Sequence, residues 1–366
     1  MNRRTLLQSG IAAMLGAPLL AAWKQDRLEA AAEVLARATA DGGVRSAVLY
    51  VRQGDREFAR AFGQAESEQA MFLLGSISKP VCVTALMTLF DRGQFALDDP
   101  LRKFLPAFKG EGREHVTLRH LLTHVSGLPD QLPENNQLRQ AHAPLSAFVE
   151  GAVKTPLQFA PGTRYRYSSM GILLACHVAE LISGSDILTL VDRAVLQPLD
   201  MKRSAQGLGR FAIEDFVPVQ TERAAPESGG GDPNAKGWDW NSPYWRKLGA
   251  PWGGAHASAS DIGRLLAEFL LQQGKAVKPA TARLMIENQN PKPLMARGLG
   301  WNVGTSAGSP GCSAATFGHT GSTGTLAWAD PQTKTICVVL TSLPAEAVSP
   351  HPRELASAQV AAAASS

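Results

Sequence analysis

The sequence lacks the features that mark several classes of protein. Its net charge at pH 7 is only +4, and no long basic run accompanies that excess, so nothing indicates binding to nucleic acid or to a membrane surface. No internal repeat is apparent. With 366 residues, 45% of them hydrophobic and 19% charged, the chain has the composition of a globular protein with a sizeable core, in one large or two medium domains.

Cysteine is scarce, and its four residues are not spaced for chemistry. They form no C-x-x-C pair, and no Cys/His cluster has the spacing of a zinc site. Cys82, Cys176 and Cys337 lie in apolar runs, which favours buried free thiols. An exported chain can form disulfides, and Cys312 could take part in one, but no sequence pattern indicates a disulfide. We expect no metal and no cofactor.

The apolar run near the N-terminus is too short to span a bilayer comfortably. It covers residues 11–22 and follows a twin-arginine start, Arg3-Arg4-Thr5-Leu6-Leu7. This arrangement is typical of a signal peptide of the twin-arginine type, so residues 1–22 are predicted to be removed and the protein exported to the periplasm or secreted. The alternative is a retained N-terminal anchor. We expect no stable membrane span after cleavage.

Hydrophobic periodicity predicts strands at both ends of the chain and helices between them. A helix over 26–40 is followed by two strands, 46–52 and 57–63, with a turn at Gly54. The middle is mostly helical. The C-terminal part is predicted to form strands at 298–305, 315–319, 324–329 and 334–342, then a helix at 353–364. This order predicts one sheet built from residues 23–75 and 255–366, with an all-α lobe, 76–254, inserted.

A loop rich in tryptophan interrupts this pattern between residues 221 and 254. Its first part, 227–234, has a flexible, glycine-rich composition. Trp238, Trp240, Tyr244, Trp245 and Trp252 crowd the part that follows. The segment either packs over a binding cleft or fills space structurally, and the sequence does not distinguish these alternatives.

One short motif has the residue types of a nucleophilic site. Ser76 and Lys79 are three residues apart, which on a helix places both side chains on one face. A serine hydroxyl needs a base to take its proton, and a lysine can be that base in its neutral form, which burial favours. The alternative interpretation is that Ser76 caps a helix and Lys79 is solvated.

Six segments together resemble the class C-type β-lactamase and penicillin-binding-protein-like serine hydrolases, a group that includes esterases and D-amino-acid peptidases. The resemblance covers nearly everything after Trp23. The segments, in chain order, are 75–79 (GSISK), 117–128, 161–168, 257–261, 298–301 and 318–324 (GHTGSTG). The resemblance implies an α/β (α+β) fold of the β-lactamase/transpeptidase type, with an antiparallel sheet flanked by helices and an inserted helical lobe.

The resemblance also implies roles for individual residues. Ser76 matches the nucleophile, Lys79 its partner base and Tyr167 the tyrosine that passes a proton between the serine and the leaving group. The backbone N–H groups of Ser76 and Ser322 match the oxyanion hole, a pair that needs no particular side chain. Taken alone, Tyr167 could also be a half-buried aromatic with a bonded hydroxyl.

Two positions depart from the family pattern. Ser169 stands where an asparagine is usual, and a serine offers one short hydroxyl in place of an amide. His319-Thr320-Gly321 matches the family's K-T-G strand with histidine for lysine. In β-lactamases that lysine helps to hold the substrate carboxylate, so a mostly neutral histidine weakens the anchor. The alternative for His319 is a strand-edge residue without a catalytic part.

Two other histidines, His120 and His124, lie one turn apart on a predicted helix. Neither a carboxylate nor a third ligand joins them at metal spacing, so we interpret them as structural.

The predicted function is an exported serine hydrolase that forms an acyl-enzyme on Ser76. Ser169 and His319 replace the asparagine and lysine that support strong recognition of β-lactams and D-Ala-D-Ala. A carboxylic ester is therefore the favoured substrate. The alternatives are a β-lactamase, a D-Ala-D-Ala carboxypeptidase or D-aminopeptidase, a weakly catalytic protein that binds cell-wall fragments, and a transpeptidase. We expect a small-molecule or peptidoglycan-like acyl substrate as a partner and no nucleic acid, and the sequence leaves the oligomeric state open.

Overall fold

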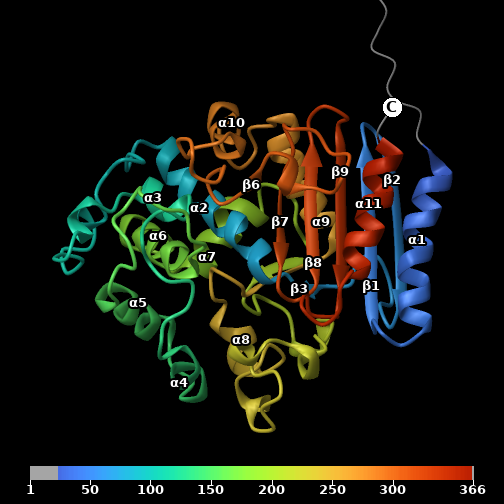
Figure 1. The fold of residues 1–366 in the computed structure, drawn as a ribbon, viewed down its shortest axis with the longest axis horizontal. Helices are drawn as coiled ribbons and strands as arrows, with labels where there is room; N and C mark the ends of the chain where they lie inside the picture. Colours follow the sequence, from blue (N-terminus) through green and yellow to red (C-terminus); the bar gives the residue numbers. More distant parts are fainter. Residues whose placement is uncertain (1–23, 365–366) are drawn as a thin grey trace, which may run out of the picture.

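The computed structural model describes residues 24–364 (Figure 1). The predicted signal peptide, residues 1–22, therefore lies outside the described residues. Strands and two covering helices occupy one half of the molecule, and most of the remaining helices occupy the other half (Figure 1).

The main sheet joins the two ends of the chain. Its strand order is β2-β1-β9-β8-β7-β6, and every neighbouring pair is antiparallel. The N-terminal hairpin β1–β2 therefore pairs directly with the last strand, β9. The bounds are β1 Ser46–Gln53, β2 Arg56–Gly63, β6 Asn302–Val303, β7 Phe317–Gly321, β8 Thr325–Asp330 and β9 Thr335–Thr341. The predicted sheet built from both chain ends is confirmed.

The two faces of the sheet bury separate apolar clusters, because successive side chains of a strand point to opposite faces. Leu49 of β1 packs with α1 (Gln25–Ala40) and α11 (Pro352–Ala364), the pair in front of the sheet in Figure 1. Its neighbour Val48 belongs to the larger cluster on the other face, with α9 (Ala259–Leu271). The Ser258 side chain accepts a hydrogen bond from the Asp261 N–H and so caps α9.

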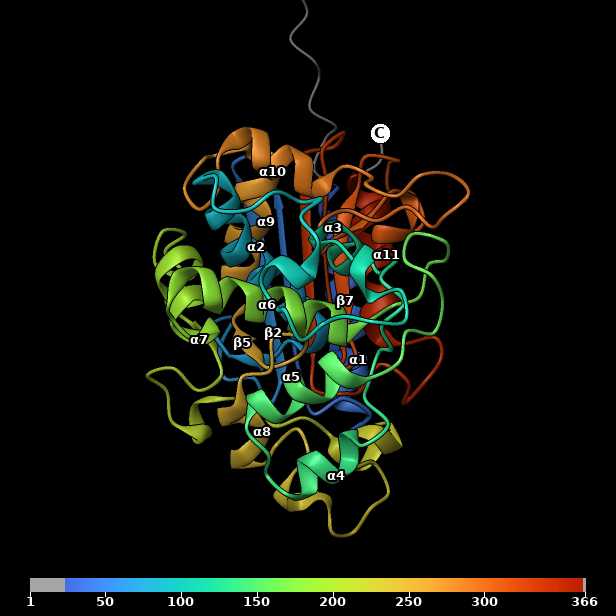
Figure 2. The same ribbon diagram turned by 90° about the vertical axis from the view of Figure 1, so that its left-hand side faces the viewer.

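The inserted lobe packs several of its helices around the two longest, α2 and α6 (Figure 2). Its helices are α2 Ser78–Asp91, α3 Leu118–Leu122, α4 Asn135–Gln140, α5 Leu145–Lys154, α6 Ser169–Ser183, α7 Ile187–Val191 and α8 Pro243–Leu248. Outside the lobe, α10 (Pro279–Ile286) packs against α9. A small second sheet, β3-β5-β4, lies at the junction, with bounds β3 Phe72–Leu73, β5 Ala255–Ala257 and β4 Ser204–Gln206. The lobe is thus helical except for β4.

The strand predicted over 298–305 is wrong for most of its length. Only Asn302–Val303 pairs in the sheet, as β6. The backbone before it turns instead: the N–H of Leu299 donates to the Met285 carbonyl, and that of Gly300 donates to the Leu122 carbonyl. These bonds fasten the segment to α10 and α3, so it cannot pair as a strand.

All four cysteines are free thiols, and Cys82, Cys176 and Cys337 are buried as predicted. Within residues 24–364, no single helix has the length and apolar character needed to cross a membrane. Only α6 together with the helical stretch 187–196 meets those criteria, as a pair bent by 82°.

The buried histidine of the small sheet, His256, makes the stability of the fold sensitive to mild acid. Burial, and then the nearby Arg246 guanidinium, lowers the pKa of His256 to about 3. The unfolded chain takes up a proton below pH ~6.5 that the folded chain refuses, so stability falls from pH ~6.5 downward. Between pH 7.5 and 5.5 this one residue should cost about 1.4 kcal/mol.

We expect His256→Asn to reduce the loss of unfolding free energy between these two pH values by about 1.4 kcal/mol, measured by urea unfolding at both. Asparagine can still donate to the Gly207 carbonyl, which His256 Nδ1 contacts at 2.9 Å. An unchanged pH dependence in the variant would contradict this assignment.

Candidate active site

Ser76 and Lys79 lie at the start of α2, as the motif predicts. Ser76 belongs to a single 3₁₀ turn, Gly75–Ile77, and Lys79 to the first turn of the helix behind it. Lys79 Nζ lies 2.9 Å from Ser76 Oγ and 3.0 Å from the Trp252 carbonyl oxygen. Lys79 is fully buried, and among residues 24–364 no carboxylate lies within ion-pair distance of its amine.

The alternative interpretation of this motif is wrong. The residue at the cap position of α2 is Ile77, and no side chain caps the helix. The buried position of Lys79 excludes a solvated role. Ser76 and Lys79 are therefore held against each other inside the protein.

Tyr167 faces the same pair from the segment that precedes α6. Lys79 Nζ lies 4.7 Å from the centroid of its ring, and the Arg297 guanidinium carbon lies 5.6 Å from it. The phenol oxygen is buried and has no hydrogen-bond partner within the described residues. The predicted nucleophile, its partner base and Tyr167 thus lie together, and the buried phenol hydroxyl is unpaired among the described residues.

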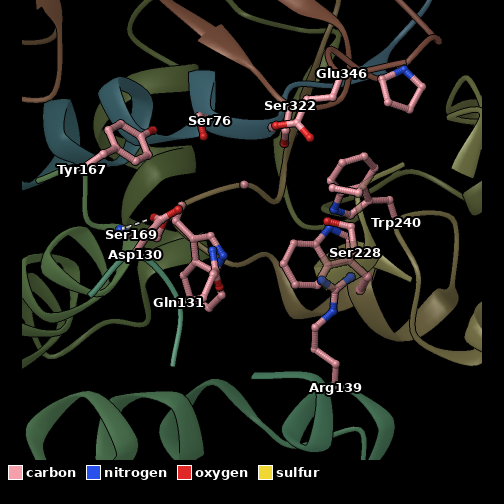
Figure 3. A pocket seen from close by; sticks show the side chains of 16 residues that line it. Ser76, Asp130, Gln131, Arg139, Tyr167, Ser169, Ser228, Trp240, Ser322 and Glu346 are labelled. Carbon is pink, nitrogen blue, oxygen red and sulfur yellow. Dashed lines mark hydrogen bonds between the residues drawn. The ribbon is translucent and has the colours of Figure 1, made fainter. Parts of the chain in front are cut away.

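Ser169 lies in the site but bonds away from Lys79. Its Oγ donates to Asp130 Oδ1 at 2.6 Å, and its backbone N–H donates to the same oxygen at 2.8 Å (Figure 3). Asp130, which no sequence motif marks, therefore accepts the hydrogen of the hydroxyl that replaces the family asparagine. Donation by that hydroxyl to a substrate carbonyl would require this bond to break.

The residues of the H-T-G strand are the last three of β7, and the His319 side chain is 3% exposed. Its Nδ1–H donates to the Thr320 carbonyl at 2.7 Å, and its Nε2 accepts from Arg297 Nη2 at 2.8 Å. Burial, followed by the charges of Arg297 and Lys79, lowers the pKa of His319 well below 6.5. His319 is therefore neutral at pH 7.

The turn after β7 is fastened to the strand that leads into Ser76. Thr323 Oγ1 donates to the Leu73 carbonyl at 2.6 Å, and Thr325 Oγ1 donates to the Leu74 carbonyl at 2.7 Å. Gly75 has φ +56°, and a Cβ built on it would lie 3.0 Å from the Ser322 nitrogen. These contacts bring the backbone nitrogens of the predicted oxyanion hole to neighbouring positions.

Two cavities meet at Ser76, Tyr167 and Ser322. The first, which we call the tryptophan cavity, encloses about 910 Å³, part of it open to solvent (Figure 3). Trp240, Trp245 and Trp252 line it, and so do the acidic residues Asp130 and Glu346. The tryptophan-rich loop therefore forms a wall of the site, which decides between the two alternatives for that segment.

The second cavity, which we call the arginine cavity, extends along β7. His319, Thr320 and Gly321 line it together with Arg297 and Arg353. A substrate whose carbonyl lies at Ser76 thus has one space available on each side.

The two histidines of the α3 region have different surroundings. His120 Nδ1 accepts from the Thr117 N–H in a capping box, which is a structural role. His124 is fully buried, and its ring centroid lies 4.4 Å from that of Tyr167. It therefore packs directly behind a predicted site residue. No group of three or more metal-binding side chains exists in the described part of the chain.

A family model matches most of the chain. The matching family is "Beta-lactamase", over residues 31–362. Among curated proteins, the chain is 32% identical over 244 residues to "Esterase EstB" of Burkholderia gladioli. The matched stretch covers 62% of this chain and 56% of that protein. It is 26% identical to a Salmonella schwarzengrund protein named "Putative D-alanyl-D-alanine carboxypeptidase", over 81% of this chain and 74% of the relative.

Solved structures agree on the fold. A penicillin-binding protein homologue from Caulobacter crescentus superposes with a TM-score of 0.75 at 20% identity, over 93% of this chain and 98% of that one. At this identity the likeness concerns the fold alone.

Substitution of Gly75 tests whether the backbone nitrogens of Ser76 and Ser322 form the oxyanion hole. We expect Gly75→Ala to slow labelling of the protein by a fluorophosphonate at least about tenfold, since a Cβ there displaces the Ser322 nitrogen from Ser76. Mass spectrometry of the adduct over time gives the rate.

The matched control is Gly54→Ala in the β1–β2 turn. Gly54 has a similar φ of +60°, but nothing lies within 4 Å of a Cβ built on it. It carries the same backbone strain far from Ser76, so its labelling rate should match that of the wild type. Equal slowing in both variants would attribute the effect to strain alone.

Proposed function

The chain belongs to the beta-lactamase family, and from that membership we propose that it is a serine hydrolase that cleaves carboxylic esters through an acyl-enzyme on Ser76. The observation that carries this proposal is the 2.9 Å contact between Ser76 Oγ and Lys79 Nζ beneath the Tyr167 ring. A hydroxyl and an amine in contact, with a phenol beside them, can move a proton off the nucleophile and onto a leaving group.

The reaction begins when Ser76 Oγ attacks the ester carbonyl carbon and gives its proton to Lys79 Nζ. A neutral Nζ can accept this proton while one of its own hydrogens is donated to the Trp252 carbonyl. The negative charge on the carbonyl oxygen is stabilised by the N–H groups of Ser76 and Ser322.

The intermediate then collapses, and the bond to the alcohol oxygen breaks. Tyr167 delivers its phenol proton to that oxygen, so the alcohol leaves neutral. The phenolate then receives the proton that Lys79 took from Ser76. Water attacks the acyl-enzyme by the same route in reverse, releasing the carboxylic acid and restoring Ser76.

An ester is favoured over an amide because of the contacts of Ser169. Its hydroxyl hydrogen is donated to Asp130 at 2.6 Å, so Ser169 has no donor left for the carbonyl oxygen of a substrate amide at that position. An amide carbonyl that is buried on binding without a donor is costly, and a simple ester has no additional amide group to satisfy there. The similarity to the Burkholderia esterase supports the same choice, and the Salmonella relative keeps a D-Ala-D-Ala peptidase as the second candidate.

We also propose that the twin-arginine start exports the enzyme to the periplasm or the medium. Replacing Arg3 and Arg4 by lysine in the full chain should retain the protein in the cytoplasm, as measured by cell fractionation. Normal export of that variant would reject this route.

The substrate proposal predicts turnover of 4-nitrophenyl butyrate with a kcat/KM at least about 100-fold above that for benzylpenicillin. Ser76→Ala, purified in the same way, should fall to background. Penicillin hydrolysis as fast as ester hydrolysis would reject the ester preference. An acyl adduct that forms but never hydrolyses would favour the binding-protein alternative instead.

The role of Lys79 is tested by a variant with another basic side chain. Arginine cannot give up a proton in a protein, so Lys79→Arg should lose at least about a hundredfold in kcat, as Lys79→Met should. Circular dichroism of both variants checks that the fold survives the change at this buried position. Substantial activity of Lys79→Arg would contradict the assignment of Lys79 as the base.

A further inference from the structure

Tyr167 lies in a segment without regular secondary structure. It precedes α6, which begins at Ser169. Its phenol oxygen is buried and has no hydrogen-bond partner within the described residues. Two cations, Lys79 and Arg297, lie 4.7 Å and 5.6 Å from the centroid of its ring, but their hydrogen bonds go to other residues. The position of the phenol is therefore set neither by a bond at its tip nor by a helix or strand.

His124 holds this segment on both sides of Tyr167. The carbonyl oxygen of His124 accepts a hydrogen bond from the Arg166 N–H at 2.9 Å, and its Nδ1 accepts from the Ser168 N–H at 3.2 Å. The imidazole ring packs against the Tyr167 ring, with a centroid distance of 4.4 Å and an angle of 40° between the planes. One residue thus binds both neighbours of Tyr167 in the chain and supports its ring.

The His124 ring is neutral and leaves one donor unpaired. Burial, followed by the charges of Arg297 and Lys79, lowers the pKa of His124 well below 6.5, so the ring carries a single N–H hydrogen at pH 7. Because Nδ1 accepts from Ser168, that hydrogen is on Nε2, which is buried without a hydrogen-bond partner in residues 24–364. An unpaired buried donor is unfavourable. Stability alone therefore does not account for an imidazole at this position.

We propose that His124 is a positioning residue that holds the Tyr167 phenol at the oxygen of the leaving alcohol. This inference rests on the ester hydrolysis proposed above, in which Tyr167 donates its proton to that oxygen. An error of about 1 Å in the position of such a group can cost on the order of a hundredfold in rate. Removing the contacts of His124 should therefore slow the reactions that need the Tyr167 proton and leave the others almost unchanged.

The test compares two butyrate esters whose leaving groups differ in their need for a proton. Ethoxide is a strong base, so ethyl butyrate requires protonation of the leaving oxygen, whereas 4-nitrophenolate leaves without it. The readout is kcat/KM for ethyl butyrate divided by kcat/KM for 4-nitrophenyl butyrate, which we call the leaving-group ratio. It reports acylation, the step that releases the alcohol.

His124→Asn should lower the leaving-group ratio at least about tenfold. Asparagine tolerates the left-handed backbone of this position, where φ is +62°, and can still accept from the Ser168 N–H, but it removes the ring behind Tyr167. Tyr167→Phe should lower the ratio further. In that background His124→Asn should change it by less than about twofold, because the group that His124 positions is already absent.

The matched control is His120→Asn. His120 also accepts a backbone N–H at Nδ1, that of Thr117, but it does so in the capping box of α3. This variant makes the same substitution one helical turn earlier in the chain and should keep the wild-type leaving-group ratio.

An unchanged ratio in His124→Asn would overturn the proposal, and so would an equal loss with and without the Tyr167 hydroxyl. His124→Phe is a second variant, which keeps an aromatic ring but removes the acceptor for the Ser168 N–H, and it should also lower the ratio. Circular dichroism checks the fold of both. If neither variant folds, His124 serves the fold alone and the positioning role is rejected.

If the wild type hydrolyses neither ester, the proposed function fails separately. Crystal structures of the wild type and of His124→Asn then still decide the role of His124. Displacement of the Tyr167 phenol oxygen by about 1 Å or more in the variant supports that role, and a smaller displacement rejects it.

Discussion

The site depends on one buried contact, that of the Lys79 amine with Ser76 Oγ and the Trp252 carbonyl. The amine cannot be hydrated there, since Lys79 is fully buried, so each of its bonds must come from the protein. The carbonyl belongs to a loop more than 170 residues further along the chain. Removing that loop would expose the amine to water, so the tryptophan-rich segment is part of the catalytic arrangement as well as a wall of its cavity.

The sheet supplies the second half of the arrangement. Thr323 and Thr325 bind the carbonyls of Leu73 and Leu74 at 2.6 and 2.7 Å, which fixes the β7–β8 turn against the entry to α2. Both chain ends are needed for this, because β1 and β9 pair within the same sheet. The fold thus joins an N-terminal nucleophile to a C-terminal backbone donor, and neither segment could make the site alone.

Local sequence spacing made part of the candidate active site predictable. Ser76 and Lys79 are one helical turn apart, and the family resemblance identified Tyr167 and the β7 strand, so the structure brings together residues that short motifs had marked. Asp130 and Arg297 were missed because their partners, Ser169 and His319, are 39 and 22 residues away, and no periodicity reports such contacts. The strand predicted over 298–305 was wrong for the same reason: its backbone bonds go to other elements, which alternation of apolar residues cannot reveal.

The exchange of lysine for histidine on β7 is then more than the loss of an anchor. A neutral His319 at the Nδ1–H tautomer needs a donor for Nε2, and Arg297 provides it at 2.8 Å. The positive charge is kept but displaced toward the arginine cavity, while the acidic residues of the site line the other cavity. The exchange thus leaves the β7 strand itself uncharged and places the positive charge on the segment that precedes β6.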